Sequence, residues 1–164
     1  MSNRLLWGAR TASIAVAVCF AAAMPPAATA ADTPAPEPVA RAQPLDKARA
    51  LIAAKQWPAS LAELKRLDLR GSADWQNLMG YVSRKSSPPD LAAAETHYNE
   101  ALRLEPAHRG ALEYSGELYL MKGDLAQAEA RLATLAQACN RCEEQADLAA
   151  AVARYKANGN RYQP

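Results

Sequence analysis

Two stretches of the chain, 73–108 and 109–142, share one layout, and this internal repeat constrains the fold more than any other feature. Each stretch begins with a predicted helix that holds one internal glycine. A polar turn follows, and then a second predicted helix with a small residue on its inner face. The glycines lie 36 residues apart and the small residues 34 apart; they are Gly80 and Gly116, and Ala94 and Ala128.

The internal glycines predict close contact between helices. Glycine in a helix costs about 1 kcal/mol relative to alanine, so it is favoured only where a neighbouring helix leaves no room for a side chain. We therefore expect Gly80 and Gly116 at such contacts. Ala94 and Ala128 are expected to face them from the second helix of each stretch, and the bulky Tyr98 and Leu132 are expected to fill the wider space one turn further on.

The rest of the folded region is also predicted to be helical. From Leu45 onward, Gly, Pro, Ser and Asp interrupt the chain at short intervals and leave segments of about 10–15 residues, which is a normal helix length. No stretch alternates apolar and polar residues for long enough to predict a strand. The chain is 50% hydrophobic but only 6% aromatic, and alanine dominates the apolar residues. The predicted fold class is all-α.

The layout resembles the tetratricopeptide repeat (TPR), a 34-residue helix–turn–helix unit. The most specific match is 98–106 (YNEALRLEP), which is close to the end of a TPR unit. The other matching segments are 77–81 (NLMGY), 114–119 (YSGELY) and 123–128 (GDLAQA). Ser83 departs from the family, which usually has an aromatic residue there, and Asn140 stands where proline is usual. The resemblance implies a short right-handed superhelical stack of antiparallel helix pairs, with a concave and a convex face.

The resemblance extends to both sides of the two clear repeats. Residues 41–72 read as a degenerate first repeat, with Ser60 as its small inner residue. Residues 143–157 form a predicted amphipathic capping helix, which a repeat stack needs at its open end. The predicted TPR domain thus spans 45–157, with a tail at 158–164. Three units are near the minimum for a stable stack, so an open end could pair with a second copy as a homodimer.

Residues 1–30 have the three parts of a secretory signal peptide. Arg4 and Arg10 provide the positive start, and 14–24 is an apolar run of 11 residues, too short for a membrane span of about 20. Ala28-Thr29-Ala30 is suited to cleavage after Ala30. We expect an exported protein, periplasmic in a Gram-negative source, with no stable membrane insertion after cleavage. A lipoprotein would use Cys19, but the preceding Val18 disfavours this.

The segment 31–44 (ADTPAPEPVARAQP) has four prolines in 14 residues and almost nothing to bury. Such a composition favours polyproline II and disorder, and we interpret it as a spacer.

The charge balance of the mature chain argues against nucleic-acid binding. Of the 19 Lys and Arg residues, two fall in the signal, so 17 basic residues stand against 17 acidic ones in the mature chain. A nucleic-acid partner would require a basic surplus.

Cys139 and Cys142 are the only cysteines of the predicted mature chain. A four-thiolate zinc site would need a second pair, and haem attachment would need histidine where Glu143 stands. In an oxidising compartment we favour a disulfide that fixes the junction between the second repeat and the capping helix. A reduced thiol pair with a copper or redox role stays open.

No other pattern predicts chemistry. His97 and His108 lack a second ligand at metal-binding spacing, so we expect surface or interhelix roles for them. The sequence has no phosphate loop, nucleophile elbow or isolated carboxylate pair. We therefore predict neither an enzyme, nor a cofactor, nor a metal site.

The leading functional hypothesis is a non-enzymatic adaptor or assembly module of the cell envelope that binds a protein or peptide. The TPR resemblance implies that the first helix of each repeat lines the binding face. The residues expected to face outward there are Asn77, Tyr81, Arg84, Lys85, Glu113, Glu117 and Met121. The alternative is a redox or metal-handling accessory protein, of the kind that serves cytochrome maturation, centred on Cys139 and Cys142.

Overall fold

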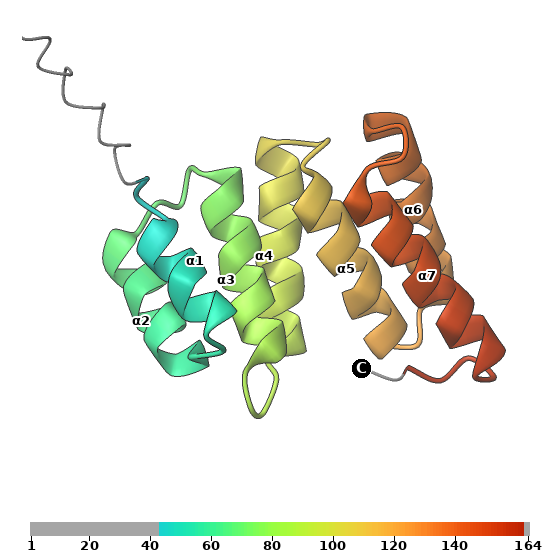
Figure 1. Cartoon of the computed structure of the whole chain (residues 1–164), viewed down its shortest axis with the longest axis horizontal. Coiled ribbons are helices and arrows are strands. Elements are labelled where there is room, and N and C mark those ends of the chain that lie inside the picture. The colour runs from blue at the N-terminus through green and yellow to red at the C-terminus, as the bar shows by residue number, and fades with distance from the viewer. Residues whose placement is uncertain (1–42, 163–164) are drawn as a thin grey trace, which may run out of the picture. The chain divides into compact units, whose positions relative to one another are not determined.

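A computed structural model describes residues 43–162, and these residues form seven α-helices and no strand (Figure 1). The helices are α1 (Asp46–Ala53), α2 (Trp57–Leu67), α3 (Ala73–Lys85), α4 (Leu91–Leu104), α5 (Arg109–Met121), α6 (Leu125–Ala138) and α7 (Glu143–Ala157). The all-α prediction is confirmed for this part of the chain. The predicted signal peptide, 1–30, and residues 31–42 of the predicted spacer lie outside the described residues.

Capping side chains explain where four of these helices begin. Ser72 accepts a hydrogen bond from the Trp75 N–H at the start of α3, which satisfies a backbone donor that has no partner within the helix. Asp90 and Asp124 likewise accept a backbone N–H through their carboxylates at the starts of α4 and α6. At the start of α5, His108 accepts the Ala111 N–H through Nδ1 at 3.1 Å.

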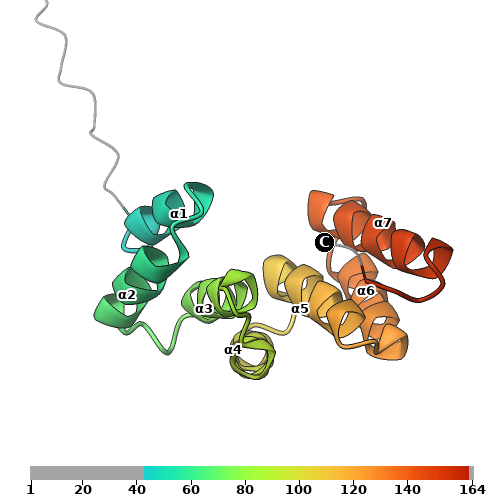
Figure 2. The ribbon, with the colours of Figure 1, turned by 90° about the horizontal axis from the view of Figure 1, so that it is seen from below.

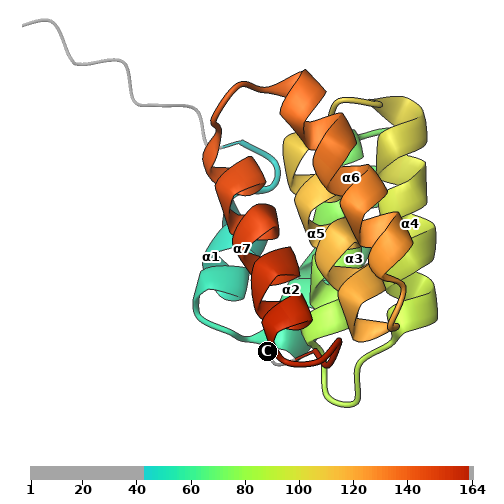
Figure 3. The same ribbon diagram turned by 90° about the vertical axis from the view of Figure 1, so that its right-hand side faces the viewer.

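The described helices pack in chain order. Each helix contacts the next one, and α5 also contacts α3 and α7. Figure 2 shows α1, α3, α5 and α7 on one side and α2, α4 and α6 on the other. Figure 3 shows α7 lying beside α5 and α6. The odd-numbered helices α3, α5 and α7 therefore share one face.

The core consists of three clusters that follow one another along the chain. The first joins α1, α2 and α3, and there the Trp75 Nε1 donates to the carbonyl oxygen of Leu64 at 2.8 Å. The second lies between α4 and α5, around the fully buried Tyr98. The third joins α5, α6 and α7 around Leu112, Leu135 and Leu148. Each cluster thus holds one group of neighbouring helices together.

Both repeat glycines lie at close helix contacts. A Cβ on Gly80 would lie 2.7 Å from the ring of Tyr98, whereas the sequence pattern placed Ala94 opposite this glycine and Tyr98 one turn further on. A Cβ on Gly116 would lie 2.6 Å from Leu148, which belongs to α7 and not to the predicted partner helix α6. The difference arises because α7 packs directly on α5. Ala128 of α6 is nevertheless fully buried.

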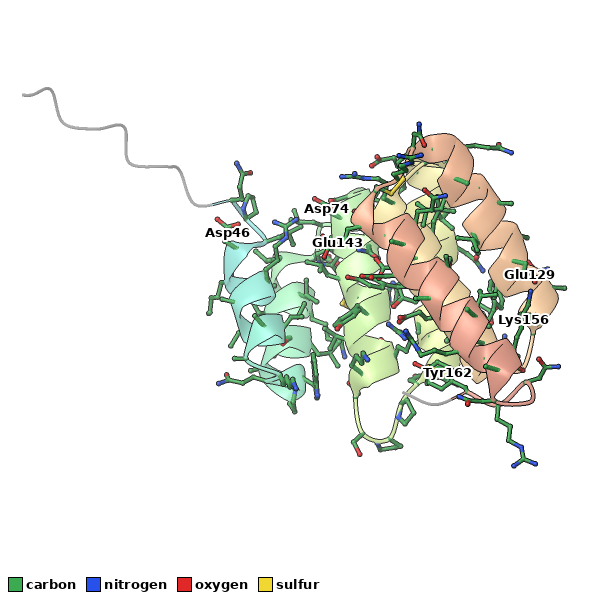
Figure 4. The ribbon with its side chains drawn as sticks, turned by 45° about the vertical axis from the view of Figure 1, so that its right-hand side comes forward. Asp46, Asp74, Glu129, Glu143, Lys156 and Tyr162 are labelled. Atoms are coloured by element: carbon green, nitrogen blue, oxygen red, sulfur yellow. A yellow bond between two sulfur atoms is a disulfide. The ribbon has the colours of Figure 1, made fainter. Side chains whose placement is uncertain are left out.

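The helix α7 covers the end of the repeat region. The residues predicted to form its apolar face, Leu148, Val152 and Tyr155, are all buried. On its outer side, Lys156 forms an ion pair with Glu129 of α6 at 2.5 Å, and both side chains are labelled in Figure 4. The chain then turns at Gly159 and Asn160, both with positive φ, and reaches Tyr162.

Candidate functional site

The seven predicted binding residues lie on α3 and α5, which contact each other, and we call the surface that these two helices form together the α3–α5 face. Arg84 of α3 pairs with Glu117 of α5, with 2.7 Å between Nη1 and Oε2. The same Nη1 lies 4.0 Å from the sulfur atom of Met121. At the other end of the face, the side-chain nitrogen of Asn77 would lie 2.9 Å from a Cβ on Gly110, so the start of α5 is also close to α3.

A row of half-buried aromatic rings crosses this face. The ring centroids of Trp57 and Tyr81 are 6.2 Å apart, and those of Tyr81 and Tyr114 are 4.8 Å apart. The guanidinium carbon of Arg84 lies 5.6 Å and 5.7 Å from the Tyr81 and Tyr114 centroids, and the Lys85 Nζ lies 5.9 Å from that of Tyr81. These distances permit cation–π attraction. We call Trp57, Tyr81 and Tyr114 the aromatic row.

Arg84 is the most buried charge on the face. Its side chain is 1% exposed, whereas that of its partner Glu117 is 21% exposed. Burial by itself lowers the pKa of the Arg84 guanidinium, but Tyr98 and Glu117 favour the cation, and the net effect raises that pKa. Arg84 therefore stays charged at any physiological pH.

Three buried polar atoms of Arg84 and Tyr98 form no hydrogen bond of good geometry. They are the Nε and Nη2 of Arg84 and the hydroxyl of Tyr98. A buried polar group without a partner costs about 1–3 kcal/mol, and such groups are rare in native proteins. Arg84 and Tyr98 are close enough to interact with each other inside the fold, so this cluster belongs to the packing between α3 and α4.

Glu113 is a carboxyl group without a neutralising partner. It is 7% exposed, and burial raises its pKa to about 8, with further contributions from the negative charges of Glu117, Asp147 and Glu144. Arg84 acts in the opposite direction, but it is already engaged by Glu117. Glu113 is therefore largely protonated at neutral pH, and it supplies a hydroxyl group in place of the negative charge that a glutamate ordinarily carries.

The exposure of the seven residues differs from the expectation that they all point outward. Asn77, Arg84 and Glu113 are buried, at 7%, 3% and 7% exposure. Tyr81, Glu117 and Met121 are half-buried, and Lys85 is exposed. The physical reason is the side-by-side packing of α3, α5 and α7, which covers the central residues of each face. The outward assignment of the three buried residues is corrected accordingly.

Sequence reasoning missed three aromatic residues of this face. Tyr114 stands three residues before Glu117 and seven before Met121, so helical spacing alone would have placed it beside them. Trp57 begins α2, and the sequence suggested only a helix break there. Tyr162 follows α7 (Figure 4) and lies close enough to Glu117 and Arg84 for their charges to shift its pKa, which is raised mainly by burial. No sequence pattern pointed to Tyr162.

The two histidines connect helices. The Nδ1 of His97 lies 2.7 Å from the side-chain oxygen of Gln76, and burial lowers the pKa of His97. The Nε2 of His108 lies 3.1 Å from Asp74 of α3, while its Nδ1 caps α5. His97 also lines a cavity of about 480 Å³ with Trp75 and other residues of α2 and α3. Within 43–162, no group of three or more His, Cys, Asp and Glu side chains could hold a metal ion.

Cys139 and Cys142 lie at disulfide-bonding distance, with 5.8 Å between their Cα atoms. Cys139 follows the last residue of α6 and Cys142 precedes the first residue of α7. Between them, Arg141 has a positive φ, and its N–H donates to the side chain of Gln145. The pair thus spans the junction between α6 and α7, far along the chain from the α3–α5 face.

Comparison with protein-family models, with curated proteins and with solved structures finds no match to this chain. Among residues 43–162, no helix combines the length and the apolar character that a membrane crossing requires.

Proposed function

We propose that this chain is an exported, TPR-like interaction protein that binds a protein or peptide segment on the α3–α5 face and carries out no chemical reaction. The first helices of the two clear repeats, α3 and α5, supply this face, as the TPR resemblance implies. In this proposal α7 takes the place of the first helix of a further repeat, because it packs on α5 and buries the apolar side that α5 would otherwise expose.

The observation that carries the proposal is the aromatic row, with the Arg84–Glu117 ion pair beside it. Trp57, Tyr81 and Tyr114 are half-buried, and the guanidinium carbon of Arg84 lies 5.6 Å from the Tyr81 centroid and 5.7 Å from the Tyr114 centroid. Arginine and tyrosine are the residue types that contribute most to protein interfaces when they are desolvated. A partner that packs on the half-buried rings would complete their burial.

Site-specific photocrosslinking in the exporting cell tests the proposal. A photoreactive phenylalanine replaces Tyr81 on the α3–α5 face in one variant and the exposed Ala130 of α6 in a matched control. We expect a discrete adduct of one or a few proteins from position 81 and none from position 130. The same adducts from both positions, or none from position 81, would contradict binding on this face.

The second candidate, a redox or metal-handling accessory, rests on the place of Cys142. It stands at the N-terminus of α7, where the helix dipole stabilises a thiolate. Thiol titration and metal analysis of the protein purified from the periplasm distinguish the two functions. An interaction protein should show no free thiol without denaturant and no bound metal. Reactive thiols or stoichiometric copper would favour the accessory function instead.

A further inference from the structure

We propose that a cavity between α2 and α4 is a second binding site, and that it takes a small organic carboxylate that also carries a hydrogen-bond donor. We call it the α2–α4 cavity. It belongs to the side of the even-numbered helices (Figure 2), so it goes beyond the function proposed for the α3–α5 face. Lys65 and His97 are the residues that would hold the two polar ends of the ligand.

The arrangement of the helices leaves room for a ligand. Both α2 and α4 pack on α3, but they make no extended contact with each other. The cavity between them has a volume of about 480 Å³, and it is lined by Lys65 after the middle of α2, by His97 of α4 and by the buried Trp75 and Met79 of α3. This volume is within the range of small-molecule sites, about 300–1,000 Å³. The buried side chains of α3 suit an apolar ligand body.

The next repeat shows what normally closes such a space. There, the Nη2 of Arg131 in α6 donates to the side-chain oxygen of Asn99 in α4 at 3.1 Å. Arg131 stands one 34-residue repeat period after His97. Asn99 stands the same period after Lys65. Among the residues that the structure describes, no hydrogen bond joins Lys65 to His97, and the cavity lies where the equivalent pair forms a bridge.

Gln76 determines which ring nitrogen of His97 can accept a hydrogen bond. The side-chain nitrogen of Gln76 donates to the carbonyl oxygen of Arg70 at 2.9 Å, so the side-chain oxygen is the atom that lies 2.7 Å from the Nδ1 of His97. The Nδ1 must therefore carry the proton and donate it. Burial lowers the pKa of His97, so the ring stays neutral at pH 7. The Nε2 then keeps its lone pair and accepts a hydrogen bond from a ligand.

The charges around the cavity favour a monoanion. Asp68 and Arg70 line it as an ion pair, with 2.7 Å between the carboxylate and the Nε of the arginine, so they balance each other. Lys65 is exposed and forms no ion pair within residues 43–162. One positive charge thus remains to be matched. A carboxylate matches it, whereas a phosphate would bring about one negative charge too many.

These features define the chemistry of the ligand. Its carboxylate pairs with Lys65, its hydroxyl or N–H donates to the Nε2 of His97, and its apolar body lies against Trp75. The ligand thereby supplies the bridge between α2 and α4 that the next repeat makes with its own side chains. A free small acid and the carboxyl end of a peptide both have this chemistry, and the experiment distinguishes them.

NMR titration of the ¹⁵N-labelled protein purified from the exporting cell tests the proposal. The probe is para-hydroxybenzoate, which has a carboxylate, a flat apolar ring and a hydroxyl group. The Nε1–H of Trp75 donates to the Leu64 carbonyl oxygen at 2.8 Å and reports on the cavity, and Trp57→Phe assigns its cross-peak. We expect a saturable shift with a dissociation constant of about 1 mM or lower. The uncharged methyl ester and benzoate, which has no hydroxyl, should each bind about 3–10-fold more weakly.

Two variants test the two polar ends separately. Asparagine in His97→Asn keeps an N–H about where the Nδ1 lies, so the bond to Gln76 can persist, but it has no acceptor at the Nε2 position. This variant should bind para-hydroxybenzoate about 3–10-fold more weakly and bind benzoate unchanged. Lys65→Gln should weaken the binding of both acids but not of the ester. Lys85→Gln, which removes an exposed cation from the α3–α5 face, is the matched control and should change none of these affinities.

An N-acetylated tripeptide that ends in phenylalanine identifies the source of the carboxylate. Tighter binding of the tripeptide than of para-hydroxybenzoate would identify the carboxyl end of a peptide, and weaker binding would identify a free acid. Absence of a shift with both probes at millimolar concentrations would overturn the proposal. Equal affinities for para-hydroxybenzoate, its ester and benzoate would also overturn it, as would ¹⁵N shifts that place the proton of the free His97 ring on Nε2. The crosslinking at position 81 is independent of all these outcomes, because it tests the α3–α5 face.

Discussion

Gly116 of α5 and Leu148 of α7 touch so closely that a Cβ on the glycine would lie 2.6 Å from both methyl carbons of the leucine. Gly116→Leu should therefore lower the free energy of unfolding by about 1–3 kcal/mol or more, because the added side chain forces α7 away from α5. Denaturant unfolding followed by circular dichroism measures the loss. Gly71→Leu is the matched control, since nothing lies within 4 Å of that position. An unchanged unfolding curve for Gly116→Leu would show that α7 does not pack there.

The ion pair between Arg84 and Glu117 yields a second prediction. Glu117→Ala should cost about 2–5 kcal/mol of stability, because it leaves the Arg84 guanidinium buried without a counter-charge. The double variant Arg84→Met, Glu117→Leu removes both charges and should recover most of this loss. Thermal or denaturant unfolding of the single variants Arg84→Met and Glu117→Leu and of the double variant gives the coupling energy. Additive losses would contradict a buried pair.

Glu113 should make stability depend on pH. Its folded pKa of about 8 lies above the ordinary value of 4.5, so the folded state binds the proton more tightly than the unfolded state. The stabilisation is complete below pH 4.5 and is lost as the pH rises to about 8. Glu113→Gln imitates the protonated acid and should be more stable than wild type by up to a few kcal/mol at pH 8, but similar at pH 4.5. Unfolding measured across this range, with the exposed Glu105→Gln as control, checks the sign.

Replacing Cys139 and Cys142 by serine should lower stability modestly. Closing so short a loop stabilises by roughly 2 kcal/mol in the chain-entropy model, and the pair connects α6 to α7. Hydrogen exchange should become faster at the start of α7, while α3 and α4 keep their protection. Partner capture through position 81 should persist at low temperature. A double variant that is as stable as wild type but loses its partner or a bound metal would identify the cysteines as the functional site.

The mature protein is predicted to begin at Ala31. The positive start, the apolar run 14–24 and the small residues 28–30 motivate cleavage after Ala30. The intact mass of the exported protein should lack residues 1–30. A full-length form retained in the membrane fraction would contradict the prediction, and Ala30→Leu, which places a large residue at the cleavage site, should cause such retention.

Local rules of sequence predicted most of the fold. Helix breakers predicted the turns. The cost of glycine in a helix predicted that Gly80 lies at a close helix contact, and helical spacing predicted the apolar side of α7. The same rules could not predict which residue contacts Gly116. Whether α6 or α7 packs against this glycine depends on the direction that α7 takes after the Cys139–Cys142 junction.

The candidate site could be predicted only as a set of residues. Arg84 and Lys85 are adjacent and both basic, yet the structure buries the first and exposes the second. The burial of Arg84 depends on its contacts with Glu117 and Tyr114 of α5. No pattern within α3 predicts which of the two basic residues is buried. The same holds for Glu113, whose raised pKa depends on burial and on the charges of α7.

The packing of each helix against helices near it in the chain has a consequence for the speed and order of folding. Contacts between residues close in sequence require only short loops to close, and chains of this kind fold in about microseconds to milliseconds. Within residues 43–162, no extended contact joins helices more than two apart in chain order. A chain that crosses a membrane with its N-terminus first could therefore complete the contacts of α1 to α4 while α7 is still on the other side.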